Sequence, residues 1–118
     1  MSKHNETGLK GEQIAKNFLQ KKGYNILHCN WRFGRKEVDI IANNEKTLVF
    51  VEVKTRSNFD FGFPEEAVSV QKQAFLKTAA EAYLDENPHI TDIRFDIISI
   101  LLNGAAIKEI RHFEDAFY

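Results

Sequence analysis

The chain has 118 residues, of which 43% are hydrophobic and 28% charged, so we expect one folded domain over residues 1–118 with a buried core. Its single cysteine excludes an internal disulfide framework, and no apolar run approaches the roughly 20 residues that cross a membrane. The net charge of −1 does not by itself indicate a polyanionic partner, and the first residues lack the apolar segment of a signal peptide, so we expect a cytoplasmic protein without membrane contact.

Basic and acidic residues are unevenly distributed along the chain. Residues 1–56 hold 11 basic and 6 acidic residues, whereas residues 57–118 hold 5 and 11. This asymmetry indicates a surface with one basic side if the fold gathers the basic residues on one face. Two solvated charge mixtures that interleave in space explain it equally well.

The first predicted element is a helix over about Thr7–Lys22, which ends at Gly23, a residue suited to the position after a helix. Its apolar face contains Ile14, Ala15, Phe18 and Leu19. The next segment, YNILHCNWRF, has the residue types of a strand, and it is predicted to run into a basic and aromatic loop, WRFGRK.

A hairpin is predicted after this loop. EVDIIA and TLVFVEVKT each have the apolar, β-branched composition of a buried strand, and NNEK between them has the residues of a tight turn. Beyond the second strand, the segment SNFDFGFPEE is predicted to be a loop because it contains glycine and proline.

The second half of the chain is predicted to contain one helix and another strand pair. The helix spans about Ser69–Glu86 and stops before Pro88. IRFDIISILL and AAIKEIRHF form the strands, and Asn103-Gly104 between them is a hairpin dipeptide. Together, the elements predict an α/β or α+β domain in which two helices flank mixed strands and cover one face of the sheet.

Two charged residues interrupt the apolar strand Leu48–Arg56. Glu52 and Lys54 project to the same face because side chains alternate along a strand, and their Cα atoms lie about 6.6 Å apart at roughly 3.3 Å per residue. A buried charge is costly unless it is paired or holds a metal. The two residues therefore either neutralise each other or mark a site.

Asp39 on the preceding strand joins them in two of three registers. A two-residue turn at Asn44-Glu45 places Asp39 diagonal to Glu52 on the same face, and a turn at Glu45-Lys46 places it directly opposite. A three-residue loop would turn Asp39 to the other face. Because two-residue turns are the commoner ones, we expect the two carboxylates to meet, with Lys54 one step beyond them.

Two adjacent carboxylates repel each other, so each binds a proton more tightly unless positive charge compensates. Lys54 offsets part of the charge, and a divalent cation would offset more. Carboxylate ligands that leave places for water suit Mg²⁺ or Mn²⁺, and the backbone carbonyl of Val53 is a further candidate ligand. The four histidines are scattered, without the spacing of a zinc site.

Glu12 on the first predicted helix is another candidate for this site. At roughly 100° per residue, it lies about 20° from Leu19 and therefore borders the apolar face. An ordinary ion pair with Lys16, four residues later, explains Glu12 slightly better from spacing alone.

Asp39, followed by Glu52-Val53-Lys54, resembles the signature of the PD-(D/E)xK nuclease superfamily, although Val38 stands where that signature has proline. The chain as a whole resembles the YraN family of small bacterial proteins. The matching segments extend over nearly the whole chain: GLKGEQIA (8–15), NWR (30–32), EVDIIA (37–42), VFVEVKTR (49–56), AV (67–68), RFDI (94–97) and HFEDAF (112–117).

This resemblance implies a restriction-endonuclease-like fold with a central mixed five-stranded sheet, similar in outline to archaeal Holliday junction resolvases. It also implies metal-assisted hydrolysis of phosphodiester bonds. In such folds, the positions of Asp39 and Glu52 hold the metal, and the position of Lys54 assists the attacking water. An acid on the first helix often adds to the catalytic site, and Glu12 matches that position. The resemblance leaves a homodimer open, since resolvases often dimerise.

Basic and aromatic residues flank the predicted site. Trp31 and Phe33 are candidates to stack on unpaired bases, although core packing explains Trp31 slightly better. Asp96 and His112 are expected to have structural roles. Four basic residues are candidates for contacts with backbone phosphates: Arg32, Arg35, Lys36 and Arg56.

Three functions are compatible with these patterns. The first is a Mg²⁺- or Mn²⁺-dependent nuclease that acts on DNA rather than RNA, on branched or damaged structures. The second is a catalytically silent nucleic-acid-binding module that keeps the nuclease fold, which the modest net charge favours. The third is a protein-interaction module that docks through the aromatic segments NFDFGF and HFEDAFY. The first is favoured because two acids and a lysine are costly to keep in a buried sheet.

Overall fold

The computed structural model describes residues 6–57 and 68–117. Its helices and strands are, in chain order, α1 (Glu6–Lys21), β1 (Asn25–Phe33), β2 (Lys36–Asn44), β3 (Thr47–Arg56), α2 (Val70–Glu86), β4 (Ile93–Asn103) and β5 (Ala106–Phe117). None of the described helices is long and apolar enough to cross a membrane. The predicted loop between β3 and α2, with its aromatic segment NFDFGF, lies outside the described residues except for Ser57.

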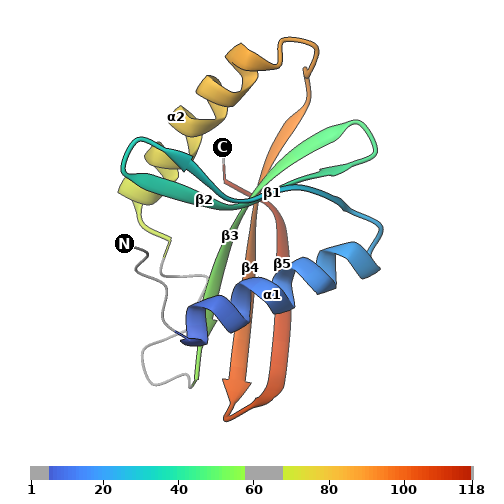
Figure 1. The fold of residues 1–118 in the computed structure, drawn as a ribbon, viewed down its shortest axis with the longest axis vertical. Helices are drawn as coiled ribbons and strands as arrows, with labels where there is room; N and C mark the ends of the chain where they lie inside the picture. The colour runs from blue at the N-terminus through green and yellow to red at the C-terminus, as the bar shows by residue number, and fades with distance from the viewer. Residues whose placement is uncertain (1–5, 58–67, 118) are drawn as a thin grey trace.

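The five strands form one mixed sheet in the order β1-β2-β3-β4-β5 (Figure 1). β3 and β4 are parallel, and the other neighbouring strands are antiparallel. Parallel neighbours need a crossover connection, and α2 lies within the connection between β3 and β4. This sheet and the element order α-β-β-β-α-β-β confirm the predicted α/β fold class.

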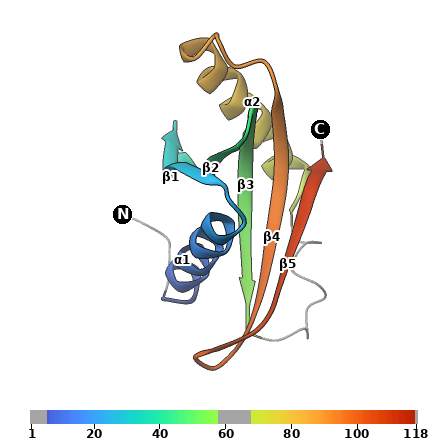
Figure 2. The ribbon, with the colours of Figure 1, turned by 90° about the vertical axis from the view of Figure 1, so that its right-hand side faces the viewer.

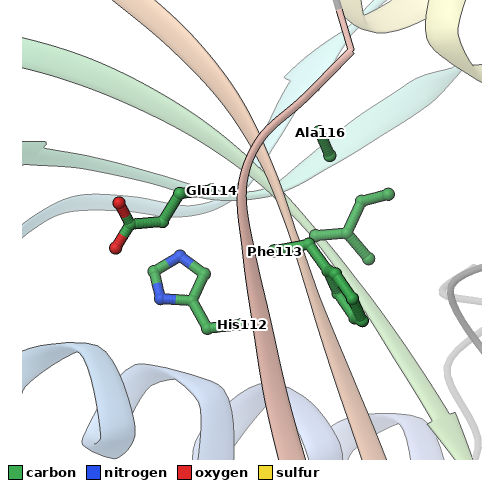
Figure 3. A pocket seen from close by; sticks show the side chains of 5 residues that line it. His112, Phe113, Glu114 and Ala116 are labelled. Carbon is green, nitrogen blue, oxygen red and sulfur yellow. The ribbon is translucent and has the colours of Figure 1, made fainter.

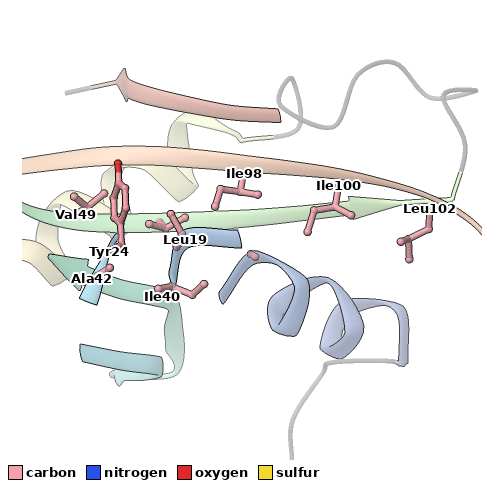
Figure 4. Close-up of a cluster of buried hydrophobic side chains, with 10 residues drawn as sticks. Leu19, Tyr24, Ile40, Ala42, Val49, Ile98, Ile100 and Leu102 are labelled. Atoms are coloured by element: carbon pink, nitrogen blue, oxygen red, sulfur yellow. The ribbon is translucent and has the colours of Figure 1, made fainter. Parts of the chain in front are cut away.

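A helix packs on each face of the sheet, so the prediction that one face is covered is wrong. The helices contribute to separate clusters because α1 and the crossover through α2 lie on opposite sides of β3 (Figures 1 and 2). The α1-side core contains Ala15, Leu19, Tyr24, Ile40, Ala42, Val49, Val51, Ile98, Ile100 and Leu102 (Figure 4). The α2-side core contains Val38, Ile41, Leu48, Phe50, Leu76, Ala79, Ala80, Tyr83 and Phe95.

Trp31–Phe33, predicted to belong to a loop, form the end of β1, and the turn into β2 has only two residues, Gly34-Arg35. The glycine has a φ of 65°, a conformation that favours this residue type. Aromatic residues fit strands, and tertiary contact holds them there: Trp31 meets Tyr83 of α2 edge-on, with ring centroids 5.3 Å apart. Packing against α2 therefore extends the strand beyond its predicted end.

The side chains of β2 change from one face of the sheet to the other at Asp39. Ile40 belongs to the α1-side core, whereas Val38, two residues earlier, belongs to the α2-side core. Regular alternation would put both on one face. On β1, Asn30 occupies the position opposite Asp39 and has a φ of 54°, which asparagine tolerates better than most residues. Asp39 therefore lies where the hairpin changes face.

The last strand is longer than predicted and extends to Phe117. This residue pairs with Phe95 on β4, and the two rings stack with centroids 5.2 Å apart. The loop of this hairpin is Gly104-Ala105 rather than Asn103-Gly104, and its glycine has a φ of 61° at the first loop position. The segment HFEDAF is therefore part of the sheet rather than a free tail for docking.

Candidate functional site

Strands β2 and β3 place Asp39 opposite Glu52. The turn between these strands is Glu45-Lys46, the second of the predicted registers, and the paired residues run from Asn44–Thr47 to Ile40–Val51. Asp39 and Glu52 are the next residues in this register. The structure therefore brings together the two carboxylates that the sequence pattern singled out.

Asp39 accepts a hydrogen bond where the backbone ladder between β2 and β3 has ended. The N–H of Val53 donates this bond to Asp39 Oδ2 over 2.8 Å. The N–H and C=O of one strand residue point toward the same neighbouring strand, so the carbonyl of Val53 faces this gap as well. Three predicted oxygen ligands, from Asp39, Glu52 and Val53, thus lie around the point where the strands separate.

Glu52 is buried between two lysines. Its Oε2 lies 3.4 Å from Lys54 Nζ, its Oε1 lies 3.5 Å from Lys72 Nζ, and its side chain is 4% exposed. Among the residues that the structure describes, none donates a hydrogen bond to Oε1. Burial raises the pKa of Glu52 to about 7, the charge of Asp39 adds to this effect, and the two lysines oppose it.

Asp39 shares this electrostatic environment. Burial raises its pKa, the hydrogen bond from Val53 opposes the increase, and the negative charge of Glu12 adds to it. The charge of Glu12 on α1 therefore affects Asp39, whereas its role in a catalytic site and the alternative ion pair with Lys16 stay predictions. Carboxylates from three elements thus influence one another at this site.

The oxygen donors at this site are few. Within residues 6–57 and 68–117, no group of three or more His, Cys, Asp and Glu side chains is arranged to hold a metal ion. The donors that remain are the carboxylates of Asp39 and Glu52 and the carbonyl of Val53.

Lys72 of α2 is a member of the site that the sequence reasoning missed. It lies in the first turn of the helix, where its N–H donates to the hydroxyl of the N-cap residue Ser69 over 3.1 Å. A positive side chain in the first turn opposes the helix dipole. An acidic partner elsewhere in the fold explains such a lysine better. The position of Lys72 in the first turn of a predicted helix was therefore the signal that could have identified its contact with Glu52.

Close packing of α1 against β3 positions the site from the other face of the sheet. Gly11 is buried, and a Cβ atom there would overlap Thr55 Oγ1 and lie 2.9 Å from Thr55 Cβ. Glu12 follows Gly11 directly in α1, and Lys54 precedes Thr55 in β3. The absence of a side chain at Gly11 therefore sets the distance between α1 and the strand that carries Glu52.

Replacing Gly11 by alanine is expected to destabilise the protein. Overpacking costs about 1–3 kcal/mol, whereas alanine in a helix gains about 1 kcal/mol over glycine, so we expect a net loss of up to about 2 kcal/mol. Urea unfolding measures this change. The double variant Gly11→Ala/Thr55→Ala lacks the overlapping hydroxyl and should recover part of the loss. A Gly11→Ala variant more stable than the wild type would contradict the close approach.

The four basic residues predicted to contact phosphates do not lie together. Arg35 lies in the turn of the β1–β2 hairpin, and Lys36 follows it as the first residue of β2. Arg32 lies in the same hairpin; its side chain is 68% exposed, and its Nη1 lies 3.9 Å from Glu37 Oε2. Arg56 ends β3, away from that turn in both views of the fold (Figures 1 and 2). The hairpin therefore carries a cluster of three exposed basic residues.

Asp96 is the centre of a separate buried network, as predicted. It accepts hydrogen bonds of 2.8 Å from Arg94 Nε and Nη2, 2.7 Å from His112 Nε2 and 3.0 Å from the N–H of Asp115. Burial alone would raise the pKa of Asp96, but these hydrogen bonds outweigh it and hold the pKa below its usual value. Asp96 is therefore ionised, and His112 donates through Nε2.

The same network joins α1 to the C-terminal strands. His112 Nδ1 lies 2.7 Å from Lys22 Nζ, and Arg94 donates a bond of 2.6 Å to the hydroxyl of Tyr24. Since Nε2 of His112 carries its proton, Nδ1 accepts from the lysine. His112 therefore has a structural role in this arrangement.

An open pocket of about 510 Å³ lies beside the network, at β5. His112 and Glu114 project to one side of the strand and Phe113 to the other (Figure 3). The residues that line it do not include any member of the Asp39–Glu52 site. The pocket is therefore separate from the carboxylate site at β2 and β3.

Comparison with known proteins identifies the family of the chain. Residues 11–100 match the family described as "Uncharacterised protein family UPF0102". The UPF0102 protein of Flavobacterium psychrophilum is 49% identical over 118 residues, with 100% of this chain and 98% of the relative covered. Those of Christiangramia forsetii and Bacteroides thetaiotaomicron are 44% and 45% identical, with 100% of this chain and 98% and 97% of the relatives covered. The chain belongs to the UPF0102 family, which is the YraN family that its sequence resembles.

Proposed function

We propose that this protein is a metal-dependent nuclease that hydrolyses phosphodiester bonds in DNA. The observation that carries the proposal is the buried carboxylate of Glu52, which lies opposite Asp39 and whose Oε1 receives no hydrogen bond from a described residue, although Lys72 Nζ lies 3.5 Å away. Two carboxylates in a sheet are costly unless a cation neutralises them. The acid, acid and lysine along β2 and β3 also follow the PD-(D/E)xK signature, on a sheet with the outline of a restriction-endonuclease-like fold.

The residues present fit Mg²⁺ or Mn²⁺. These ions take oxygen ligands, and Mg²⁺ is usually held by one or two carboxylates, with water and substrate phosphates in the other positions. Asp39, Glu52 and the carbonyl of Val53 would hold the ion. Bound there, it would polarise a phosphate oxygen and lower the pKa of the attacking water.

The other residues would bind and orient the substrate. The ammonium group of Lys54, 3.4 Å from Glu52, would stabilise negative charge that develops on the phosphate and help to position the attacking water. Lys72 on the other side of Glu52 would offer a second positive charge to a substrate oxygen. Glu12 would hold the local potential negative and so favour a cation. The β1–β2 hairpin would contact phosphates outside the cleavage site.

Binding of Mn²⁺ by the protein should depend on pH, and this tests the proposal without a substrate. Because the pKa of Glu52 is raised to about 7, its proton competes with the ion below that pH. We therefore expect the Mn²⁺ affinity to fall about tenfold per pH unit below 7, for one proton released, and to level off above pH 7. Isothermal titration calorimetry at pH 6, 7 and 8 measures this dependence.

Two variants control this titration. Asp39→Asn should lose Mn²⁺ binding, whereas Glu45→Gln, which alters an exposed acid in the β2–β3 turn, should bind like the wild type. Equal affinity in the wild type and Asp39→Asn would show that the ion binds elsewhere, and the nuclease proposal would then lose its metal centre.

Lys72 favours a second function, a catalytically silent nucleic-acid-binding module. Two ammonium groups within 3.5 Å of the Glu52 carboxylate already supply positive charge where a metal ion would. If the two lysines satisfy the site, the protein binds nucleic acid with a steep salt dependence and Mn²⁺ does not change the binding.

The preference for DNA, a homodimer and a cytoplasmic location stay predictions.

A further inference from the structure

A row of aromatic rings leads away from the carboxylate site. Lys72, whose Nζ lies 3.5 Å from Glu52 Oε1, also stands over the ring of Phe75, 5.2 Å from its centroid. The ring of Phe75 lies 6.1 Å from that of Phe33, and Phe33 lies 6.2 Å from Trp31. The three rings, here called the aromatic track, therefore form an unbroken series of contacts from Glu52 to the end of β1.

The rings of the aromatic track combine packing with exposure. Each of the three side chains is only partly buried, at the edge of the α2-side core. Trp31 and Phe33 are two residues apart in β1 and so lie on the same face of the strand. Their ring planes are within 6° of parallel. Packing against Tyr83 accounts for one contact of Trp31, and both rings of β1 remain only partly buried. Partly exposed aromatic rings are platforms on which flat groups can stack.

Positive charge borders the aromatic track. Lys36 Nζ stands over Phe75 at 5.6 Å from the ring centroid, and Lys72 Nζ stands at 5.2 Å from the same centroid. Arg32 and Arg35 are exposed in the same β1–β2 hairpin. Aromatic platforms interleaved with basic side chains suit a nucleic-acid strand, whose bases stack while its phosphates pair with the cations.

We propose that the aromatic track binds unpaired nucleotides and guides their strand to the carboxylate site. This inference rests on the proposed nuclease function and names its substrate class, DNA with a single-stranded segment. Bases in a duplex already stack on one another, so only unpaired bases can offer their faces to Phe33 and Trp31. A duplex could contact the basic residues of the hairpin through its phosphates but would gain nothing from the rings.

Trp31 gives a direct measurement of this binding because it is the only tryptophan of the chain. We would titrate the protein with an oligothymidine and with a duplex of equal length, at one salt concentration and in EDTA. We expect the oligothymidine to quench the tryptophan fluorescence and to bind at least about tenfold more tightly than the duplex. Equal affinities, or no quenching by the single strand, would overturn the inference.

Phe33→Leu tests the stacking contact, and the chain offers a matched control. Removing one stacked ring should weaken single-strand binding about 5- to 100-fold and leave duplex binding unchanged. Phe18→Leu alters another half-buried phenylalanine with a lysine, Lys22, 5.2 Å from its ring centroid, but on α1, and should change neither affinity. Unchanged single-strand affinity in Phe33→Leu would overturn the inference. Circular dichroism confirms that both variants are folded.

A second variant and a second assay complete the test. Lys36→Gln changes an exposed side chain and should weaken single-strand and duplex binding together, since it removes a contact with phosphate. A loss confined to the duplex would contradict the placement of the strand. The binding titration in EDTA does not depend on a metal ion. Selective single-strand binding in EDTA, together with no cleavage in Mn²⁺, would therefore refute the nuclease function alone. Cleavage of single strands at the wild-type rate by Phe33→Leu would refute the aromatic track alone.

Discussion

Replacing Lys54 by alanine is expected to lower the rate of DNA cleavage about 10²- to 10³-fold, the usual effect of removing one group that stabilises charge in the transition state. Asp39→Asn is expected to abolish cleavage, because it removes a proposed metal ligand. The measurement is the single-turnover rate on a DNA substrate with a single-stranded segment in Mn²⁺. Both variants should keep the fold. Asp39→Asn removes a charge that repels Glu52, and Lys54→Ala removes an ion pair with Glu52. Both changes lie at one edge of the core and leave its apolar packing intact.

Lys46→Ala is the matched control for Lys54→Ala. Lys46 is an exposed lysine in the β2–β3 turn, at the opposite end of β3 from the site, and its loss should leave the rate unchanged. The same residual cleavage in the wild type and in both site variants would identify a contaminating nuclease. Thermal unfolding within a few degrees of the wild type would show that the rates compare folded proteins.

The largest effect on stability is expected from Asp96→Ala. This variant leaves the guanidinium of Arg94 without its main partner and removes the acceptor for His112 and the N–H of Asp115. Breaking a buried ion pair on one side costs about 3–5 kcal/mol, which is a large part of the stability of a domain of this size. Urea denaturation, followed by circular dichroism, should show this loss as a lower midpoint with an unchanged slope.

Asp92→Ala is the comparison for Asp96→Ala. The carboxylate of Asp92 accepts one exposed hydrogen bond of 2.7 Å from Thr47, so its loss should cost about 1 kcal/mol or less. A similar loss in both variants would contradict the central role of Asp96.

The pH dependence of stability should also reflect Asp96. Its folded pKa is below the usual value of 3.8, so the unfolded chain takes up a proton first as the pH falls. The stabilisation from Asp96 is therefore present above pH 3.8 and is lost as the pH falls through the lower folded value. Acid unfolding of Asp96→Asn should consequently show a weaker pH dependence below pH 4 than that of the wild type.

Local patterns predicted much of the fold. The helix that the sequence placed at Thr7–Lys22 is Glu6–Lys21, and the helix placed at Ser69–Glu86 begins one residue later because Ser69 is its N-cap. The approach of Asp39 to Glu52 was predictable because alternation along a strand and a two-residue turn leave few registers. These features depend on residues close together in the sequence.

Features that depend on distant contacts were not predictable. Lys72 reaches Glu52 only because the crossover places the first turn of α2 beside β3, and no local pattern gives that distance. Trp31 joined the strand rather than a loop because Tyr83, 52 residues away in the sequence, packs against it. The change of face at Asp39 is the exception to simple alternation, and the structure accompanies it with a positive φ at Asn30, which no sequence pattern gives.

The parallel pairing of β3 and β4 has a kinetic consequence. These neighbours in the sheet are separated in the chain by the whole of α2, so their pairing requires closure of a long loop before any contact compensates for the lost entropy. Asp39 and Glu52 can meet in a local hairpin, but Lys72 joins them only when this closure is complete. During refolding, the contact of Lys72 with Glu52 should therefore form late, together with the final cooperative step rather than with early hairpin formation.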